Sequence, residues 1–190
     1  MRRLVIATKN QGKLREVRAV LTGLRYEVVS LEAYPDAPDV EETGGTFEAN
    51  AVLKATECAR YTGELTLADD SGLVVDALDG APGALSSRFA PTDAERNAKL
   101  LDLMKDIPDD RRTARFVCVI AIAEPDGCAR TCEGRVEGVI AGAPRGTNGF
   151  GYDPVFYLPD LGKTMAELSP DEKNAISHRG RALAEARKML

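Results

Sequence analysis

The sequence has few of the residues that define several common protein classes. Aromatic residues make up 5% of its 190 residues, His178 is the single histidine, and the four cysteines are scattered. A zinc site is therefore disfavoured, because the spacing of Cys128 and Cys132 is loose and the other two cysteines lie far from them. A chain of this size needs no disulfide bonds to fold, and reduced thiols are typical of the cytoplasm. We expect free cysteines and a cytoplasmic location.

The chain also lacks an excess of basic residues and a long apolar run. Lys and Arg number 25 against 30 Asp and Glu, which gives a net charge of −5 at pH 7. General binders of nucleic acids or anionic membranes should be basic, so neither partner is expected. The longest uncharged apolar stretch, 116–123, is far shorter than the roughly 18 residues that cross a bilayer. The apolar run 4–7 is too short for a signal peptide.

Apolar periodicity predicts alternating strands and helices. The expected strands are 4–7, 26–31, 65–68, 73–75, 114–123, 128–140 and 154–158. Helices are expected after the polar loop 8–13, from Thr46, after the capping box of Thr92 and Glu95, and after Ser169 and Ser177. This alternation predicts an α/β fold with a mixed sheet and flanking helices, formed by one domain, 1–190.

The helix that follows Thr92 is interpreted as structural. Its apolar positions fall at helical spacing and would form the buried stripe: Ala94, Ala98, Leu101 and Met104.

Paired carboxylates follow an apolar strand at Asp69 and Asp70. We expect this pair at the strand end, where carboxylate oxygens could hold a hard cation together with Glu41 or Glu42. Adjacent residues of an extended strand face opposite sides, so one member of each pair should face the metal, and Asp70 is favoured. The alternative is that these residues merely cap a turn.

Two further segments suit a nucleotide. The polar loop 8–13 precedes a helix, whose free backbone N–H groups favour an anion such as phosphate, although a solvated turn is the alternative. The glycine-rich loop 146–153 carries Phe150 and Asp153, and Lys173, His178 and Arg179 follow it. An aromatic face beside donors and acceptors suits a nucleobase, whereas packing roles for Phe150 and His178 are the alternative.

Seven motifs, in order along residues 4–183, resemble the inosine triphosphate pyrophosphatase family, also called Ham1. They are Thr8-x-Asn10-x-x-Lys13, Glu41-Glu42-Thr43-Gly44, Asn50 with Lys54, Asp69-Asp70-Ser71-Gly72-Leu73, Gly80-Ala81-Pro82-Gly83 with Arg88, Gly149-Phe150-Gly151-Tyr152-Asp153-Pro154 and Ser177-His178-Arg179-Gly180. The resemblance implies an elongated mixed sheet with two lobes around a central substrate cleft, and a homodimer.

The resemblance also implies hydrolysis of non-canonical purine nucleoside triphosphates (ITP, dITP and XTP) to the monophosphate and pyrophosphate, which cleanses the nucleotide pool. Mg²⁺, with Mn²⁺ as a substitute, would be held by Asp70 with Asp69, Glu41 or Glu42, and Asp70 would orient or deprotonate the attacking water. The implied substrate-binding residues are Thr8, Asn10, Lys13, Asn50, Lys54, Ser71, Arg88, Phe150, Gly151, Tyr152, Asp153, Lys173, His178 and Arg179.

Base selectivity would follow from donor and acceptor matching. His178 and Arg179 would donate to the 6-keto oxygen that inosine and xanthosine carry and adenine lacks. Two alternatives stay open: a Maf-like nucleotide pyrophosphatase of other base specificity, and a catalytically silent nucleotide-binding protein.

Overall fold

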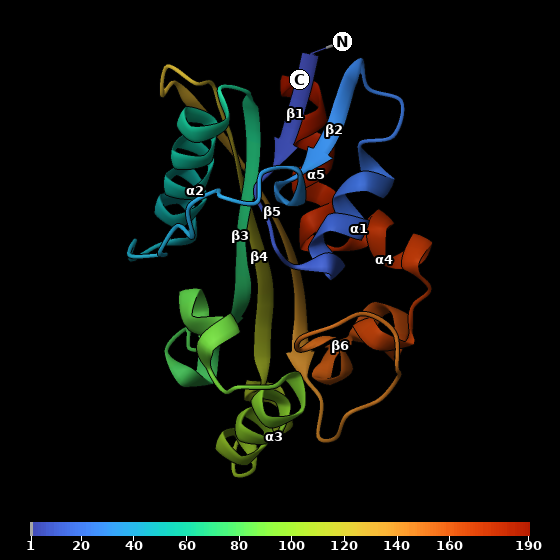
Figure 1. The fold of residues 1–190 in the computed structure, drawn as a ribbon. Coiled ribbons are helices and arrows are strands. Elements are labelled where there is room, and N and C mark those ends of the chain that lie inside the picture. Colours follow the sequence, from blue (N-terminus) through green and yellow to red (C-terminus); the bar gives the residue numbers. More distant parts are fainter. Residues whose placement is uncertain (1) are drawn as a thin grey trace. The chain divides into compact units, whose positions relative to one another are not determined.

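The computed structural model describes residues 2–190. Within them the strands form a seven-stranded sheet in the order β2-β1-β3-β4-β5-β6-β7 (Figure 1). The strands are β1 (Arg2–Ile6), β2 (Tyr26–Ser30), β3 (Leu65–Val75), β4 (Thr113–Ala123), β5 (Ala129–Ile140), β6 (Phe156–Leu158) and β7 (Lys163–Thr164). Strand β1 pairs in parallel with β2 and β3, whereas β6 pairs antiparallel with β5 and β7. The predicted mixed sheet is confirmed.

The longer helices lie in the five segments where the sequence predicts helices, although α1 begins earlier than expected. They are α1 (Gln11–Val20), α2 (Phe47–Thr62), α3 (Asp93–Met104), α4 (Pro170–Ile176) and α5 (His178–Met189). Short 3-10 turns add η1 (Leu31–Ala33), η2 (Asp76–Leu78), η3 (Gly83–Arg88), η4 (Asp109–Arg111), η5 (Asp153–Val155), η6 (Pro159–Leu161) and η7 (Met165–Glu167). Within residues 2–190, no helix has the length and apolar character that crossing a membrane would require.

The chain divides into two compact units. Unit 1 comprises Met1–Asp70, Cys118–Gly134 and Arg179–Leu190, and unit 2 comprises Ser71–Val117 and Arg135–His178. Strands β3, β4 and β5 contribute residues to both units, because the unit boundaries fall inside these strands.

Unit 1 is built around the buried strands β1 and β3. Apolar side chains of α1 and α5, among them Leu14, Val17 and Leu183, pack on one face of the sheet. Helix α2 lies on the opposite face and buries its alanines there (Figure 1). The limits predicted for α2 are confirmed, since Thr46 accepts a hydrogen bond from the backbone N–H of Ala49 and Gly63 ends the helix in the left-handed conformation.

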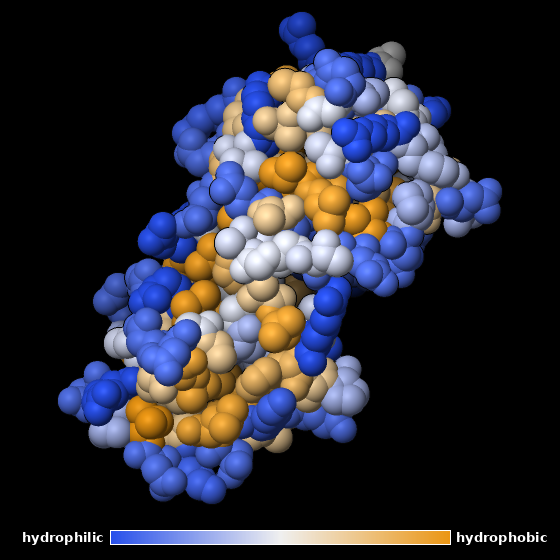
Figure 2. Space-filling view, turned by 90° about the vertical axis from the view of Figure 1, so that its left-hand side faces the viewer, coloured by the Kyte–Doolittle hydropathy of each residue, from blue (hydrophilic) through white to orange (hydrophobic). Residues whose placement is uncertain are grey.

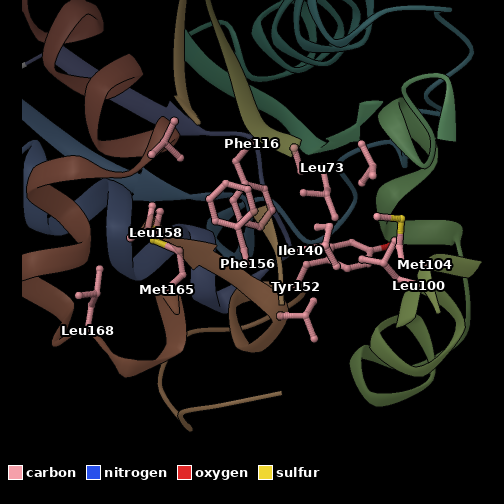
Figure 3. Packing of buried hydrophobic residues seen from close by; sticks show 14 residues of the cluster. Leu73, Leu100, Met104, Phe116, Ile140, Tyr152, Phe156, Leu158, Met165 and Leu168 are labelled. Atoms are coloured by element: carbon pink, nitrogen blue, oxygen red, sulfur yellow. The ribbon is translucent and has the colours of Figure 1, made fainter. Parts of the chain in front are cut away.

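Unit 2 has its own apolar core. Phe116 of β4 and Phe156 of β6 pack with ring centroids 4.4 Å apart, and Leu73, Leu100 and Met104 lie in the same cluster (Figure 3). Burying aromatic and aliphatic surface of this kind supplies most of the favourable free energy of folding.

The buried stripe predicted for α3 is wrong in part. Met104 is buried and Leu101 packs against the core, but Ala94 and Ala98 are exposed, and Asn97 and Leu100 point inward instead. Counting only apolar residues shifted the predicted face of the helix, because a polar residue occupies one of its buried positions.

Strand β3 is longer than predicted. The chain stays extended from Leu65 to Val75, so the acidic pair lies inside the strand and the predicted strand end is wrong. Asp69 and Asp70 are each 4% exposed, which also excludes the alternative that they cap a turn at the surface. The predicted hairpin of β4 and β5 is confirmed, with a turn in which Gly127 has a φ of +92°.

Both polar and apolar residues reach the face shown in Figure 2. The large apolar side chains that are most exposed are Tyr61, Leu85, Leu103 and Leu161. Single exposed residues of this kind are normal for a folded protein.

Candidate functional site

The acidic pair of β3 divides between two sets of partners in unit 1. Asp69 accepts hydrogen bonds from Nε and Nη2 of Arg179, both at 3.3 Å, and its Oδ2 lies 2.9 Å from Nζ of Lys13. Asp70 instead accepts a hydrogen bond from Nδ2 of Asn50 at 3.0 Å, and its Oδ1 lies 3.7 Å from Nζ of Lys54. The division follows from the alternation of side chains on an extended strand.

Electrostatics separates the two aspartates. Burial raises the pKa of the Asp69 carboxyl, but the charges of Lys13, Arg179 and Lys54 outweigh it and hold that pKa well below its ordinary value. At Asp70, burial raises the pKa, and the opposing effects of Lys54 and Asn50 do not cancel it. Asp69 is thus the more acidic of the two carboxyls and is paired with cations, whereas Asp70 is the more basic.

Lys54 of α2 lies between several oxygens. Its Nζ donates to Oε1 of Glu42 and to the backbone carbonyl of Asp69, both at 2.6 Å. Burial lowers the pKa of Lys54, but the nearby Asp69, Asp70 and Glu42 outweigh it, so the pKa is raised overall and the ammonium stays charged. Two carboxylates, Glu42 and Asp70, therefore face one positive charge.

Lys13 is placed by the start of α1. The side chain of Asn10 accepts a hydrogen bond from the backbone N–H of Lys13 at 3.1 Å, and Thr8 Oγ1 accepts one from the N–H of Asn10 at 3.2 Å. The predicted polar loop therefore ends at an N-cap, and α1 begins at Gln11 inside the segment that was expected to be loop.

Asn50 links the loop before α2 to the acidic pair. Its Oδ1 accepts a hydrogen bond from the N–H of Gly44 at 2.8 Å, while its Nδ2 donates to Asp70. A Cβ on Gly44 would lie 2.7 Å from Oδ1 of Asn50, so glycine is required for this close approach.

The four predicted metal ligands do not gather in one place. Within residues 2–190, no three His, Cys, Asp or Glu side chains form a group that could hold a metal ion. Asp69 is bonded to cations, and Glu41 is exposed. Glu42 and Asp70 remain, and both lie beside the Lys54 ammonium. Their negative charges therefore already stabilise a positive charge at this position. Two carboxylates suit Mg²⁺, which usually takes one or two from protein and its other ligands from phosphate and water.

Unit 2 contributes a second arrangement, the glycine-rich loop 146–153. Oδ2 of Asp153 accepts hydrogen bonds from Nζ of Lys173 at 2.6 Å and from the N–H of Phe150 at 2.8 Å. Nζ of Lys173 lies 4.7 Å from the centroid of the Phe150 ring, within the range of a cation–π contact. The predicted juxtaposition of Phe150, Asp153 and Lys173 is therefore present.

Two other predicted residues of unit 2, Tyr152 and His178, are buried in this structure. Tyr152 is buried and donates its hydroxyl to the carbonyl of Ser86 at 2.8 Å, and burial raises its pKa to about 12. His178 stacks on Phe116 with ring centroids 4.7 Å apart. Ser71 follows Asp70 in β3, and Arg88 is an exposed residue at the end of η3.

Sequence reasoning missed three polar residues at these two places. Glu16, one helical turn after Lys13, accepts a hydrogen bond from Nη1 of Arg179. Asp93 and Asn97 of α3 bond to the backbone of Gly151. The i to i+3 spacing of Lys13 and Glu16 could have indicated a shared helix face, but no local pattern connects α3 to the loop.

The whole chain is similar to known proteins. The Ham1 family profile matches residues 4–189. A dITP/XTP pyrophosphatase of Geobacter sulfurreducens is 55% identical over 97% of this chain and 94% of its own, and one of Desulforamulus reducens is 54% identical over 99% and 95%. The structure of a HAM1 protein from Coxiella burnetii has a TM-score of 0.91 and 47% identity, covering 100% of this chain and 98% of that one. This chain belongs to the Ham1 family.

Proposed function

We propose that this chain is a nucleoside-triphosphate pyrophosphatase that hydrolyses ITP, dITP and XTP to the monophosphate and pyrophosphate. One observation carries the proposal: consecutive carboxylates of β3 have different partners, so that Asp69 anchors two cations while Asp70 stands beside Asn50, Lys54 and Glu42. The similarity to relatives that are named dITP/XTP pyrophosphatase also supports the proposal.

The carboxylates and cations of unit 1 suit the triphosphate. Lys13 and Lys54 supply positive charge, and the start of α1 adds backbone N–H groups and side-chain polar atoms of Thr8 and Asn10. Asp70, with Glu42, would hold Mg²⁺ or Mn²⁺, which when bound neutralises charge on phosphate oxygens.

Asp70 is the residue that we assign to the attacking water. A carboxylate within hydrogen-bonding distance of the water orients the water and accepts a proton from it. The water oxygen then bonds to the α phosphorus, and pyrophosphate leaves. Asn50 holds the other side of this carboxylate, since its Nδ2 donates to Oδ2 of Asp70. The proton acceptor is thereby fixed in one orientation.

Phe150, Lys173 and His178 are the residues that we assign to the base. Phe150 offers an aromatic face and Lys173 a charged donor beside it, while His178 follows α4. Arg179 was predicted as a further donor to the 6-keto oxygen, and in this structure its guanidinium is bonded to Asp69 and Glu16 in unit 1. Its contact with the base stays a prediction. We also propose that the protein is a homodimer and that it is located in the cytoplasm. Light scattering of the purified protein would test the homodimer.

Product analysis tests the function. The purified chain with Mg²⁺ should convert dITP and XTP to the monophosphate and pyrophosphate, and should convert dATP, dCTP and dTTP far more slowly. Preference for a pyrimidine triphosphate would support the Maf-like alternative. Tight binding of dITP without turnover would support the silent nucleotide-binding alternative, and release of orthophosphate would contradict cleavage between the α and β phosphates.

A further inference from the structure

Helix α3 reaches the glycine-rich loop with two side chains on successive turns. Asp93 and Asn97 are four residues apart, so they lie on the same face of the helix. Oδ2 of Asp93 accepts a hydrogen bond from the N–H of Gly151 at 2.7 Å, and Nδ2 of Asn97 donates to the carbonyl of Gly151 at 3.0 Å. Both backbone polar groups of one loop residue are thus bonded to one helix.

Gly151 is the place in the loop where such support matters. Its φ is +63°, the left-handed region, although a Cβ at this position would meet nothing within 4 Å. The conformation, not a lack of space, therefore calls for glycine, which is also the residue with the most backbone freedom to lose. Bonds to both sides of Gly151 select one conformation from many.

Neither side chain is needed for the N-cap of the helix. Thr92 and Glu95 already form the capping box that begins α3. Asp93 is oriented by Arg96, whose Nη1 donates to Oδ1 at 2.7 Å, and this leaves Oδ2 directed at Gly151. Asn97 is 7% exposed, and within residues 2–190 no group donates to its Oδ1. The hydrogen bond that its amide makes is the one from Nδ2 to the loop, at the carbonyl of Gly151.

Gly151 directly follows the aromatic residue assigned to the base. The N–H of Phe150 bonds to Asp153, and Asp153 bonds to Lys173, so residues 150–153 form a short turn with Gly151 inside it. A rotation at Gly151 would change the direction of the Phe150 ring relative to Lys173. The geometry of α3 is therefore coupled to the surface that would contact the base.

We propose that Asp93 and Asn97 are positioning residues, which hold Gly151 so that the loop is already arranged for a purine nucleotide before it binds. The proposal rests on the proposed function, because it assigns the loop to the base. It revises the expectation that α3 is only structural. Preorganisation of this kind lowers the entropy cost of binding and should therefore affect KM more than kcat.

The test compares Asn97→Ala and Asp93→Ala with two controls on the same helix. We expect both variants to raise KM for dITP at least about fivefold, with kcat changed less than about twofold, because each loses one hydrogen bond that orders the loop. Asp93→Asn keeps an acceptor oxygen and should restore much of the affinity. Lys99→Ala removes an exposed side chain of α3, and Leu100→Ala creates a buried cavity there, and neither should raise KM.

Hydrogen exchange of the backbone provides a readout that does not depend on activity. In Asn97→Ala, the amides of residues 149–153 should exchange about tenfold faster or more, while those of β1 keep the wild-type rate. If Asn97→Ala lowered Tm as much as Leu100→Ala does and left KM unchanged, the proposal would be overturned in favour of a packing role. Equal KM increases in Asn97→Ala and Leu100→Ala would overturn it in the same way. Unchanged exchange in the loop would also overturn it. A wild-type enzyme without pyrophosphate release would refute the proposed function, and the exchange rates would still decide whether α3 holds the loop.

Discussion

At the scale of single residues, two neighbouring aspartates have opposite pKa shifts although they are equally buried. Asp69 and Asp70 are each 4% exposed, but Asp69 has Lys13 and Arg179 on its side of the strand whereas Asp70 has Asn50 and Lys54. Burial acts on both carboxyls, and the number of nearby cations decides the sign of the shift.

This difference, with the proposed role of Asp70 toward the attacking water, makes Asp70 the residue that we expect to matter most for turnover. We expect Asp70→Asn to reduce kcat for dITP by about 100-fold or more, because an amide keeps the shape and can still accept from Asn50, but it neither takes a proton nor carries the charge that holds a metal. Steady-state pyrophosphate release and far-UV circular dichroism would be measured together. Asp76→Asn, at an exposed carboxylate paired with Arg115, is the control. Retention of more than about a tenth of kcat by Asp70→Asn would contradict the assignment.

The buried hydroxyl of Tyr152 should make stability sensitive to high pH. Burial raises its pKa to about 12, above the value of about 10 in an unfolded chain, so between these values the unfolded state binds fewer protons than the folded state. The contribution of this group is complete below pH 10 and is lost as the pH rises through 12. We expect Tyr152→Phe to be less stable at pH 9 but to lose less stability between pH 10 and 12. Urea unfolding of both proteins at each pH measures the difference, and parallel curves would contradict it.

At the scale of elements, capping residues were the most dependable guide in the sequence. Thr92 and Ser169 each accept the predicted hydrogen bond at the start of α3 and α4, and Thr46, where a helix was expected to begin, accepts one at the start of α2. These interactions join residues three positions apart, so local sequence determines them. The strands were placed from short apolar runs that are rich in branched residues and bounded by polar or turn residues.

Predictions failed where distant parts of the chain decide the outcome. Strand β3 was expected to end at Asp69 because charged residues rarely lie inside a buried strand. Lys13, Lys54 and Arg179 compensate that burial, and they lie on three separate helices. In α3, Asn97 was overlooked for the same reason, since its partner Gly151 is 54 residues away. The triad of Phe150, Asp153 and Lys173 could be predicted, but its hydrogen bonds could not.

The glycine-rich loop supports a prediction with a matched glycine elsewhere. Gly149 has a φ of +77°, and a Cβ there would lie 2.0 Å from Oδ2 of Asp153, the oxygen that bonds to Lys173 and Phe150. Gly63, with a φ of +70°, has nothing within 4 Å. Both alanine variants should lose about 1 to 2 kcal/mol of stability through backbone strain. Only Gly149→Ala should also raise KM for dITP, by about tenfold or more, since it displaces Asp153. An equal KM change in both variants would show that the Asp153 contact is unimportant.

At the scale of the whole molecule, charge sets a condition for activity. The protein carries a net charge of −5, and a nucleoside triphosphate carries about four negative charges at pH 7. The charged cluster of unit 1 does not offset this, because Lys13, Lys54 and Arg179 face four carboxylates, those of Glu16, Glu42, Asp69 and Asp70. The three cations are already balanced by protein groups before any substrate binds.

We therefore expect that a divalent cation is needed to bring the triphosphate to this cluster. We expect no measurable pyrophosphate release from dITP after metal removal with a chelator, and full recovery with Mg²⁺ or Mn²⁺, because the available ligands are hard carboxylate oxygens. Zn²⁺, which favours nitrogen and sulfur ligands, should restore less activity. Glu42→Gln should raise the Mg²⁺ concentration required for half-maximal rate, whereas Glu57→Gln, on the exposed side of α2, should not. Full turnover in excess chelator would remove the metal from the mechanism, and the three cations would then have to bind the phosphates unaided, by exchanging their carboxylate partners for phosphate oxygens.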